Sequence, residues 1–377
     1  MSLITYLTRI QFESGAVKLL ASELALLKIQ RPLFVTDKGV VAAGILASVT
    51  AAAGIGEPVV FDETPGNPTE SAVLAARDLY RSAGCDGIVA VGGGSPLDLA
   101  KAVALLATHP EPLERYAAIL GGLERITADK PAVIAIPTTA GTGSEVGRAA
   151  LITLDDGRKL GFISPHMIPA VAICDPELTL KLPPALTAAT GMDAVTHCIE
   201  TYLSPRDNAP AEAIALDGLS RAMTHLERAY RDGSDLEARE GMMMASLEGG
   251  MTFQKGLGAV HGMSHALGGL KELRLHHGTL NAVILPAVLR FNAQGADRKY
   301  AALRTAMGLP AGADLAEAIE RLNASLSMPR SLAEMGVPES VIPLMVERSM
   351  ADHSTATNAR PVTAADYEAL FRSAMAG

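Results

Sequence analysis

The chain has 377 residues, more than one hydrophobic core usually supports, so we expect two domains. Its formal net charge of −9, with no run of Lys or Arg, argues against a nucleic-acid partner. No stretch reaches the ~20 apolar residues of a membrane span, no signal peptide is recognisable, and three cysteines without CxxC spacing fit reduced thiols, so we expect a cytoplasmic protein with no membrane association.

Short apolar runs alternate with helical patterns in the first half of the chain. Strands are expected at 32–36, 58–61, 87–91, 132–136 and 170–174, and helices at 40–53, 69–83 and 97–107. Continuous apolar runs separated by helices are typical of a mainly parallel sheet that is covered on both faces. Together with right-handed crossovers, they predict a Rossmann-like, doubly wound α/β domain.

After Asp175-Pro176 the pattern becomes helical, without a convincing strand. Helices are expected at 184–203, 211–231, 236–253, 278–292 and 363–375. We therefore predict an α/β dinucleotide-binding domain over residues 1–180 and an all-α domain over 181–377. The active site is expected in the interdomain cleft, because ligand sites favour such interfaces.

A glycine-rich turn, Gly92-Gly-Gly-Ser-Pro-Leu-Asp98, follows the third expected strand and opens a helix. Glycines let a backbone approach a ligand closely, and a helix N-terminus offers free N–H groups. The turn therefore predicts a pyrophosphate site. It is not a GxGxxG fingerprint, and a tight turn that only requires small residues is the alternative.

Two other strand ends carry polar groups that suit a nucleotide. Thr138, Thr139 and Thr142 lie in a hydroxyl-rich loop, for which ordinary ST-turns are the alternative. Asp37 follows the first strand and can accept hydrogen bonds from ribose hydroxyls while repelling a 2′-phosphate. This favours NAD over NADP, although a helix N-cap explains Asp37 equally well.

Acidic and imidazole groups recur at helical spacing in the second half. Asp193 and His197 are four residues apart, as are His261 and His265, so each pair shares one helix face. With His276-His277, these motifs hold five of the chain's nine histidines. The spacing predicts that these groups converge on one metal ion, with Asp193 as the oxygen ligand.

Five motifs occur in an order that resembles the iron-dependent (group III) alcohol dehydrogenases: Gly92-Gly-Gly-Ser-Pro-Leu-Asp-Leu-Ala-Lys101, Pro137-Thr-Thr-Ala-Gly-Thr-Gly-Ser-Glu145, Gly191-Met-Asp-Ala-Val-Thr-His197, Gly258-Ala-Val-His-Gly-Met-Ser-His265 and His277-Gly278. The resemblance extends from about residue 10 to beyond 290. It implies a two-domain fold with NAD(P) in the first domain and a divalent metal, Fe2+ with Zn2+ as the alternative. We also expect a homodimer or a larger homo-oligomer.

The resemblance implies roles for individual residues. The metal ligands would be Asp193, His197, His261 and His277, the last chosen over His276 because it directly precedes a glycine. His265 would lie near the nicotinamide and the substrate as the catalytic candidate that relays a proton, with a helix-packing residue as the alternative. The cofactor contacts would be Asp37, Gly93, Gly94, Ser95, Asp98, Thr138, Thr139, Thr142, Lys159 and Leu178.

The implied reaction is hydride transfer between the nicotinamide and a small alcohol or aldehyde, with the metal as Lewis acid. In the segment 252–255, where relatives usually carry smaller or apolar residues, Thr252 and Lys255 are substrate candidates, as is Arg148. Lys271 and Arg274 add further positive charge. These groups would favour an anionic substrate, with ordinary exposed charges as the alternative.

Other functions fit parts of the pattern. Maleylacetate reductase shares the fold but departs from the Asp/His ligand set. A dehydroquinate-synthase-like lyase uses NAD transiently and should need more basic residues than this chain has. A non-catalytic NAD-binding subunit is a third class, but it would keep buried Asp and His side chains unpaired at an energetic cost.

Overall fold

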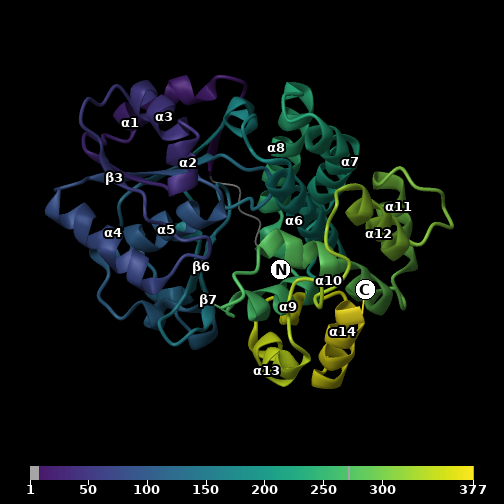
Figure 1. Ribbon diagram of the computed structural model, residues 1–377. Coiled ribbons are helices and arrows are strands. Elements are labelled where there is room, and N and C mark those ends of the chain that lie inside the picture. The colour runs from purple at the N-terminus through teal and green to yellow at the C-terminus, as the bar shows by residue number, and fades with distance from the viewer. Residues whose placement is uncertain (1–7, 271, 377) are drawn as a thin grey trace. The chain divides into compact units, whose positions relative to one another are not determined.

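The computed structural model describes residues 8–270 and 272–376 (Figure 1). These residues form two compact units. The sheet unit holds residues 8–139 and 143–182, and the helical unit holds residues 140–142 and the chain from 183 onward. Across the described residues, none of the helices has both the length and the apolar character needed to cross a bilayer.

A six-stranded parallel sheet forms the centre of the sheet unit, in the order β1-β8-β5-β4-β2-β3. Its strands are β1 (Arg9–Phe12), β2 (Pro32–Val35), β3 (Val59–Phe61), β4 (Gly87–Gly92), β5 (Val133–Pro137) and β8 (Val171–Cys174). The helices of this unit are α1 (Leu20–Leu26), α2 (Lys38–Ala42), α3 (Ile45–Ala53), α4 (Glu70–Ser82) and α5 (Gly94–Thr108). The predicted Rossmann-like parallel sheet is therefore confirmed.

Strand β4 shows why the apolar runs of the sheet are continuous. Ile88 and Ala90 belong to the core formed with α4 and α5, whereas Val89 and Val91 belong to the core formed with α1 and α3. All four side chains are fully buried. Because helices cover both faces of the sheet, neither face of the strand selects for polar residues.

The sheet unit also contains elements that the sequence analysis did not expect. Strand β1 adds an edge to the sheet, and β6 (Ala149–Thr153) with β7 (Lys159–Ile163) forms an antiparallel hairpin. The single helix expected over 40–53 is instead two helices, α2 and α3, because Gly44 between them adopts a left-handed conformation with φ of 75°.

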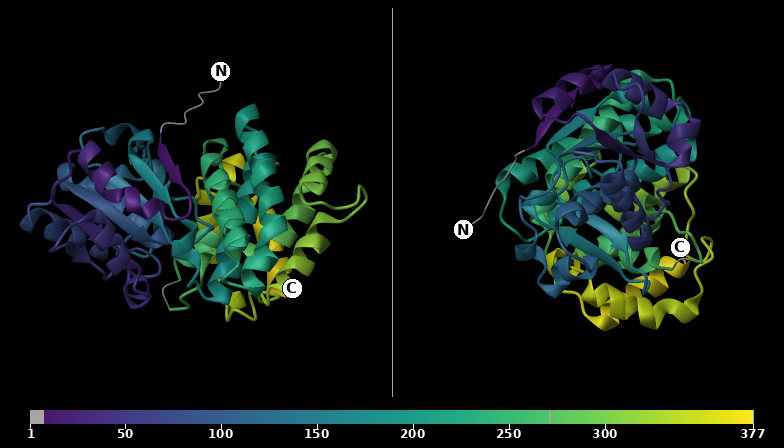
Figure 2. Two further views of the ribbon diagram at one scale, coloured as in Figure 1. Left: turned by 90° about the horizontal axis from the view of Figure 1, so that it is seen from above. Right: turned by 90° about the vertical axis from the view of Figure 1, so that its left-hand side faces the viewer.

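The helical unit contains no strand among its described residues, as predicted. Its helices are α6 (Pro184–Leu203), α7 (Ala209–Arg231), α8 (Leu236–Met251), α9 (Ala259–Gly268), α10 (His277–Asn292), α11 (Asp297–Ala306), α12 (Leu315–Ser325), α13 (Ile342–Ala351) and α14 (Ala364–Ala376). Helix α6 is buried along most of its length and packs against α7, α8 and α10 (Figures 1 and 2). A polar group on α6 therefore lies in the interior of this unit.

Candidate metal centre and cofactor loops

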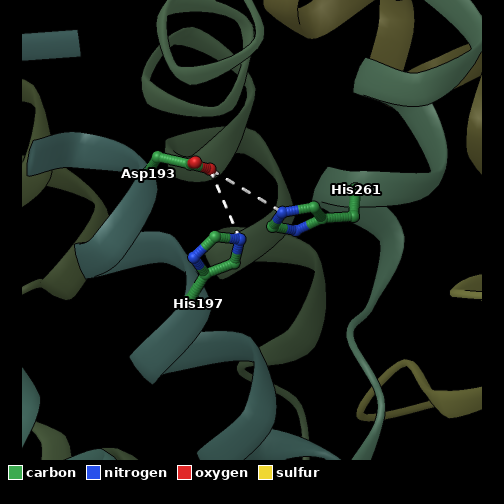
Figure 3. Close-up of side chains that lie close together, drawn as sticks. All are labelled: Asp193, His197 and His261. Carbon is green, nitrogen blue, oxygen red and sulfur yellow. Dashed lines mark ion pairs between the residues drawn. The ribbon is translucent and has the colours of Figure 1, made fainter. Parts of the chain in front are cut away.

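Four side chains of the helical unit meet around the carboxylate of Asp193. Its Oδ1 lies 3.4 Å from His197 Nε2, 3.8 Å from His261 Nε2 and 3.7 Å from His277 Nε2. Figure 3 shows the imidazoles of His197 and His261 pointing toward this carboxylate. His277 is 26% exposed and the other three are buried, so the cluster has one side open toward the surface.

Three helices position the four groups. Helix α6 supplies Asp193 and His197 one turn apart, α9 supplies His261, and α10 begins with His277. The residue after His277 is Gly278, where a Cβ would lie only 2.1 Å from the backbone oxygen of α6 at residue 189. A glycine at 278 is thus required for α10 to approach α6 closely enough to bring His277 to Asp193.

Two of the imidazoles are oriented by hydrogen bonds on the ring nitrogen that faces away from Asp193. His197 Nδ1 donates to the carbonyl oxygen of Gly141 at 3.0 Å, and His261 Nδ1 lies 2.6 Å from Glu200 Oε2. A carbonyl oxygen or a carboxylate only accepts, so the hydrogen is on Nδ1 in both rings. The Nε2 lone pairs are consequently directed at the centre of the cluster, as metal ligation requires.

The charges of the cluster favour a cation. Burial lowers the pKa of His197 to about 4, so this imidazole is neutral at pH 7. Burial would also lower the pKa of His261, but the hydrogen bond and charge of Glu200, together with the charge of Asp193, raise it. The cluster therefore places two buried carboxylates, Asp193 and Glu200, close to the neutral imidazole of His197, and a divalent ion would balance their charge.

Asn281, one helical turn after His277, provides a test of whether the cluster suits a metal. Its Nδ2 lies 2.7 Å from Asp193 Oδ1 and 3.2 Å from the Nε2 atoms of both His261 and His277. An amide NH2 has only two hydrogens, so it cannot donate to all three of these atoms. The nitrogen and oxygen lone pairs of the cluster outnumber the available donor hydrogens. Fe2+ and Zn2+ bind to such N and O ligands. The residues present thus fit a divalent metal.

Three residues that position the cluster, Glu200, Asn281 and Gly141, were not predicted from the sequence. Glu200 is seven residues after Asp193, on the same face of α6, and Asn281 is four residues after His277, so helical spacing could have indicated both. The backbone carbonyl of Gly141 is 56 residues away from His197 in the chain, and no local pattern indicates such a contact.

His265 lies beside the four grouped side chains. Its Nδ1 is 3.0 Å from Asp352 Oδ2, and its ring stacks on His277 with centroids 5.4 Å apart and an interplanar angle of 12°. Burial lowers the pKa of His265, although the charge of Asp352 opposes this effect. The catalytic role of His265 remains a prediction.

The substrate candidates of the helical unit have partners of their own. Lys255 is fully buried, with its Nζ 2.6 Å from Glu212 Oε1. The hydroxyl of Thr252 is buried, 2.6 Å from the backbone oxygen of Gly249. Arg274 is exposed, and Lys271 lies outside the described residues. Arg148 belongs to the sheet unit, where its carbonyl accepts a hydrogen bond from Ser164.

The predicted cofactor residues of the sheet unit gather mainly at the carboxyl ends of strands. From β2 the chain builds β3 on one side and then β4 on the other, so the strand order reverses between β2 and β4. Ligands bind preferentially at such a reversal. The residues that follow these strands and the neighbouring β5 are Asp37, Gly93, Gly94, Ser95, Thr138 and Thr139.

The loops after β4 and β5 press against each other and leave one polar group without a partner. The backbone N–H of Thr138 donates to Gly92, and a Cβ at Gly93 would lie 3.3 Å from the side chain of Thr139. The Thr139 hydroxyl is buried and has no hydrogen-bond partner among the described residues. Together with the N-terminus of α5, which begins here, this orphaned hydroxyl fits a phosphate-bearing cofactor.

The remaining cofactor candidates have protein partners or core contacts. Asp37 caps α2 through the N–H of Val40 at 2.9 Å, and Asp98 accepts from the Ser144 hydroxyl at 2.6 Å. Ser95 donates to the carbonyl of Gly66 at 2.7 Å, and Lys159 donates to Asn67 at 3.1 Å. Leu178 is part of a hydrophobic core, and Thr142 is grouped with the helical unit. Their contacts with a cofactor remain predictions.

Comparison with known proteins identifies relatives over the whole chain. Residues 8–176 match the model of iron-containing alcohol dehydrogenase, and residues 187–375 match the model of the C-terminal part of the Fe-containing alcohol dehydrogenase family. The chain is 56% identical to a 4-hydroxybutyrate dehydrogenase of Cupriavidus necator, covering 100% of both proteins. It superimposes on a 1,3-propanediol oxidoreductase with a TM-score of 0.93 and 36% identity, covering 99% of this chain and 100% of that one. A sulfoacetaldehyde reductase of Bifidobacterium kashiwanohense, solved with NAD+, gives a TM-score of 0.88 and 27% identity, covering 99% and 98%.

Proposed function

Since the chain belongs to the iron-containing alcohol dehydrogenase family, we propose that Asp193, His197, His261 and His277 bind its divalent metal. The chain is an NAD-linked alcohol/aldehyde oxidoreductase, as predicted. The convergence of three Nε2 atoms on Asp193 Oδ1 supports this assignment. The family is iron-dependent, so Fe2+ is the expected ion, with Zn2+ as the alternative. The orphaned hydroxyl of Thr139 supports an NAD site on the loops after β4 and β5.

The residues of the chain hold and orient the reactants in this proposal. The metal, when bound, supplies a Lewis acid for the substrate oxygen. Gly141 and Glu200 keep His197 and His261 in the tautomer that presents Nε2 to the ion. His265, whose Nδ1 is bonded to Asp352, carries the proton between the substrate hydroxyl and solvent through its Nε2. NAD+, when bound, would supply the hydride acceptor, so that oxidation of the alcohol would give the aldehyde, NADH and one proton.

We infer that the substrate is a short ω-hydroxy acid, with 4-hydroxybutyrate as the first candidate. The identity of 56% to a 4-hydroxybutyrate dehydrogenase over the full length of both chains supports this choice. It agrees with the expectation of an anionic substrate. The buried ammonium of Lys255 is already neutralised by Glu212, so we infer that other residues recognise the carboxylate.

We further infer that the protein is cytoplasmic and forms a homodimer or a larger homo-oligomer. Cys85, Cys174 and Cys198 are all free thiols, and two of them are buried, which supports a reducing compartment. Size-exclusion chromatography with light scattering tests the oligomeric state, and cell fractionation tests the compartment.

Anaerobic assays of the Fe2+- and Zn2+-loaded protein, following NADH absorbance, test the proposed reaction. With 4-hydroxybutyrate and NAD+ we expect NADH to form, and with succinate semialdehyde we expect it to be consumed. Turnover of maleylacetate but of no alcohol would favour the alternative carbonyl/ene reductase, and turnover without net NADH change would favour the lyase.

Asp193→Ala tests the metal assignment separately. The variant should lose metal and activity while it still quenches NADH fluorescence on binding, because the cofactor candidates other than Thr142 lie in the sheet unit. Loss of nucleotide binding in this variant would contradict the assignment of metal and cofactor to separate units.

A further inference from the structure

A second cluster of polar side chains in the helical unit comprises His265, Asp352 and His353, with nitrogen and oxygen atoms within 4.8 Å of one another. Asp352 and His353 directly follow α13. The side chain of His353 is 29% exposed, whereas that of His265 is buried. The cluster therefore reaches from the interior of the unit to a partly exposed imidazole.

This cluster continues the proposed metal centre through a row of imidazoles. The ring of His277 stacks on His265 at 5.4 Å, and His265 stacks on His353 at 5.8 Å with an interplanar angle of 21°. The three rings are nearly parallel, so His353 lies two stacking steps from a proposed metal ligand. The centroids of His277 and His353 are thus at most about 11 Å apart.

Asp352 determines how the two imidazoles of the cluster are turned. Its Oδ2 lies 3.0 Å from His265 Nδ1, while Oδ1 accepts from the N–H of Ser354 at 2.8 Å and lies 3.6 Å from His353 Nδ1. Burial would raise the pKa of Asp352, but the two imidazoles and these hydrogen bonds hold it well below its usual range. Asp352 therefore stays ionised, and each ring turns its Nδ1 toward this carboxylate and its Nε2 away from it.

Ser354 supplies an independent sign of a ligand. This residue is 1% exposed, and its hydroxyl has no hydrogen-bond partner among the described residues. A buried hydroxyl without a partner is costly unless a ligand or a water satisfies it. It directly follows His353, so the orphaned donor and the partly exposed imidazole are adjacent in the chain.

We propose that His353 and Ser354 form a subsite for the carboxylate of the substrate. The proposal deepens the proposed function and rests on it, because it names the group that selects a short ω-hydroxy acid. An imidazole N–H and a hydroxyl are donors that a carboxylate accepts, and the bond from a charged partner is the stronger kind. The oxygens of Asp352 are engaged by His265 Nδ1 and the N–H of Ser354, so His353 Nε2 and the Ser354 hydroxyl supply the donors to the ligand.

Steady-state kinetics with matched substrates test the subsite. In His353→Ala, kcat/KM for 4-hydroxybutyrate should fall roughly ten- to hundredfold, which corresponds to the loss of one hydrogen bond to a charged group. The kcat/KM for 1,4-butanediol, which has no carboxylate, should change less than about twofold. Ser354→Ala should show the same selectivity with a smaller loss. His166→Ala, which changes an exposed histidine of the sheet unit, is the matched control and should leave both values unchanged. Equal losses for the two substrates, or no loss, would overturn the proposal.

Inhibition by butyrate separates the subsite from the proposed function. Butyrate should inhibit 1,4-butanediol oxidation competitively, and His353→Ala should raise its inhibition constant by the same factor that it lowers kcat/KM for 4-hydroxybutyrate. If 4-hydroxybutyrate is not oxidised but butyrate inhibition still depends on His353, the proposed substrate fails and the subsite stands. Two equivalents of metal per chain in the wild type, reduced to one in His353→Ala, would overturn the subsite in favour of a second cation site.

Discussion

Glu200 joins the side chain of His261 to the start of α9. Its Oε2 accepts from His261 Nδ1 at 2.6 Å, and its Oε1 accepts from the backbone N–H of Val260 at 2.7 Å. One buried carboxylate thus caps the helix that carries a proposed metal ligand and sets the tautomer of that ligand. The position of the imidazole and its protonation state are fixed together.

Replacing Glu200 by Gln should weaken metal binding roughly ten- to hundredfold. An amide can accept on only one of its two terminal atoms, so its NH2 must face either the Val260 N–H or His261 Nδ1. In the second case the hydrogen of His261 moves to Nε2, which then cannot ligate. Competition with a fluorescent chelator measures the metal affinity.

Glu248→Gln is the matched control for that experiment, because Glu248 is a carboxylate of the same unit, on α8, with Asp217 and Arg221 as its charged neighbours. It should leave the metal affinity unchanged. Equal losses in the two variants would mean that Glu200 contributes only to general stability.

Gly141→Ala should also lower metal affinity, by about tenfold or more. A Cβ at this position would lie 2.3 Å from the backbone oxygen of Thr190, so the segment must shift and move the carbonyl that accepts from His197 Nδ1. Metal titration of the variant measures the effect, with circular dichroism to verify folding. An unchanged affinity in a folded variant would show that His197 is oriented without this carbonyl.

The pH dependence of stability should change in Glu248→Gln. Burial and the neighbouring Asp217 raise the pKa of Glu248 to about 8, above its value in the unfolded chain. Between these two values the folded state binds a proton that the unfolded state has released, so the contribution of Glu248 is present at low pH and is lost as pH rises to about 8. We expect the variant to gain about 1 kcal/mol over the wild type between pH 5 and pH 9, after allowing for partial solvent screening. Urea unfolding at both values measures this, and parallel profiles would contradict it.

Lys255→Met should affect stability and leave selectivity unchanged. Removing the ammonium leaves Glu212 with Lys299 at 3.6 Å as its remaining cationic partner, and we expect a loss of about 2–3 kcal/mol in the free energy of unfolding. The kcat/KM values for 4-hydroxybutyrate and 1,4-butanediol should change by the same factor. A double-mutant cycle with Glu212→Gln measures the coupling. A loss of kcat/KM for 4-hydroxybutyrate alone would show that Lys255 contributes to substrate binding.

The sequence predicted those parts of the molecule that depend on local periodicity. The buried strands and the Asp193/His197 pair follow from patterns of two to four residues. The β6–β7 hairpin was missed although Asp156-Gly157 at its turn is a known hairpin signal, whereas the split at Gly44 depends on a single backbone conformation. Contacts between distant segments, such as His265 with Asp352 87 residues later, have no local signal. His353 matched no motif for this reason.

The three residues 140–142 pack with the helical unit, whereas the chain on either side of them belongs to the sheet unit. The carbonyl that orients His197 is therefore two residues from the orphaned hydroxyl of Thr139. The proposed nucleotide loop and the proposed metal centre therefore share one short piece of backbone. If NAD binding changes the position of this segment, it changes the affinity of the protein for metal by some factor. Metal binding must then change the affinity for NAD by the same factor, so the two ligands are thermodynamically linked.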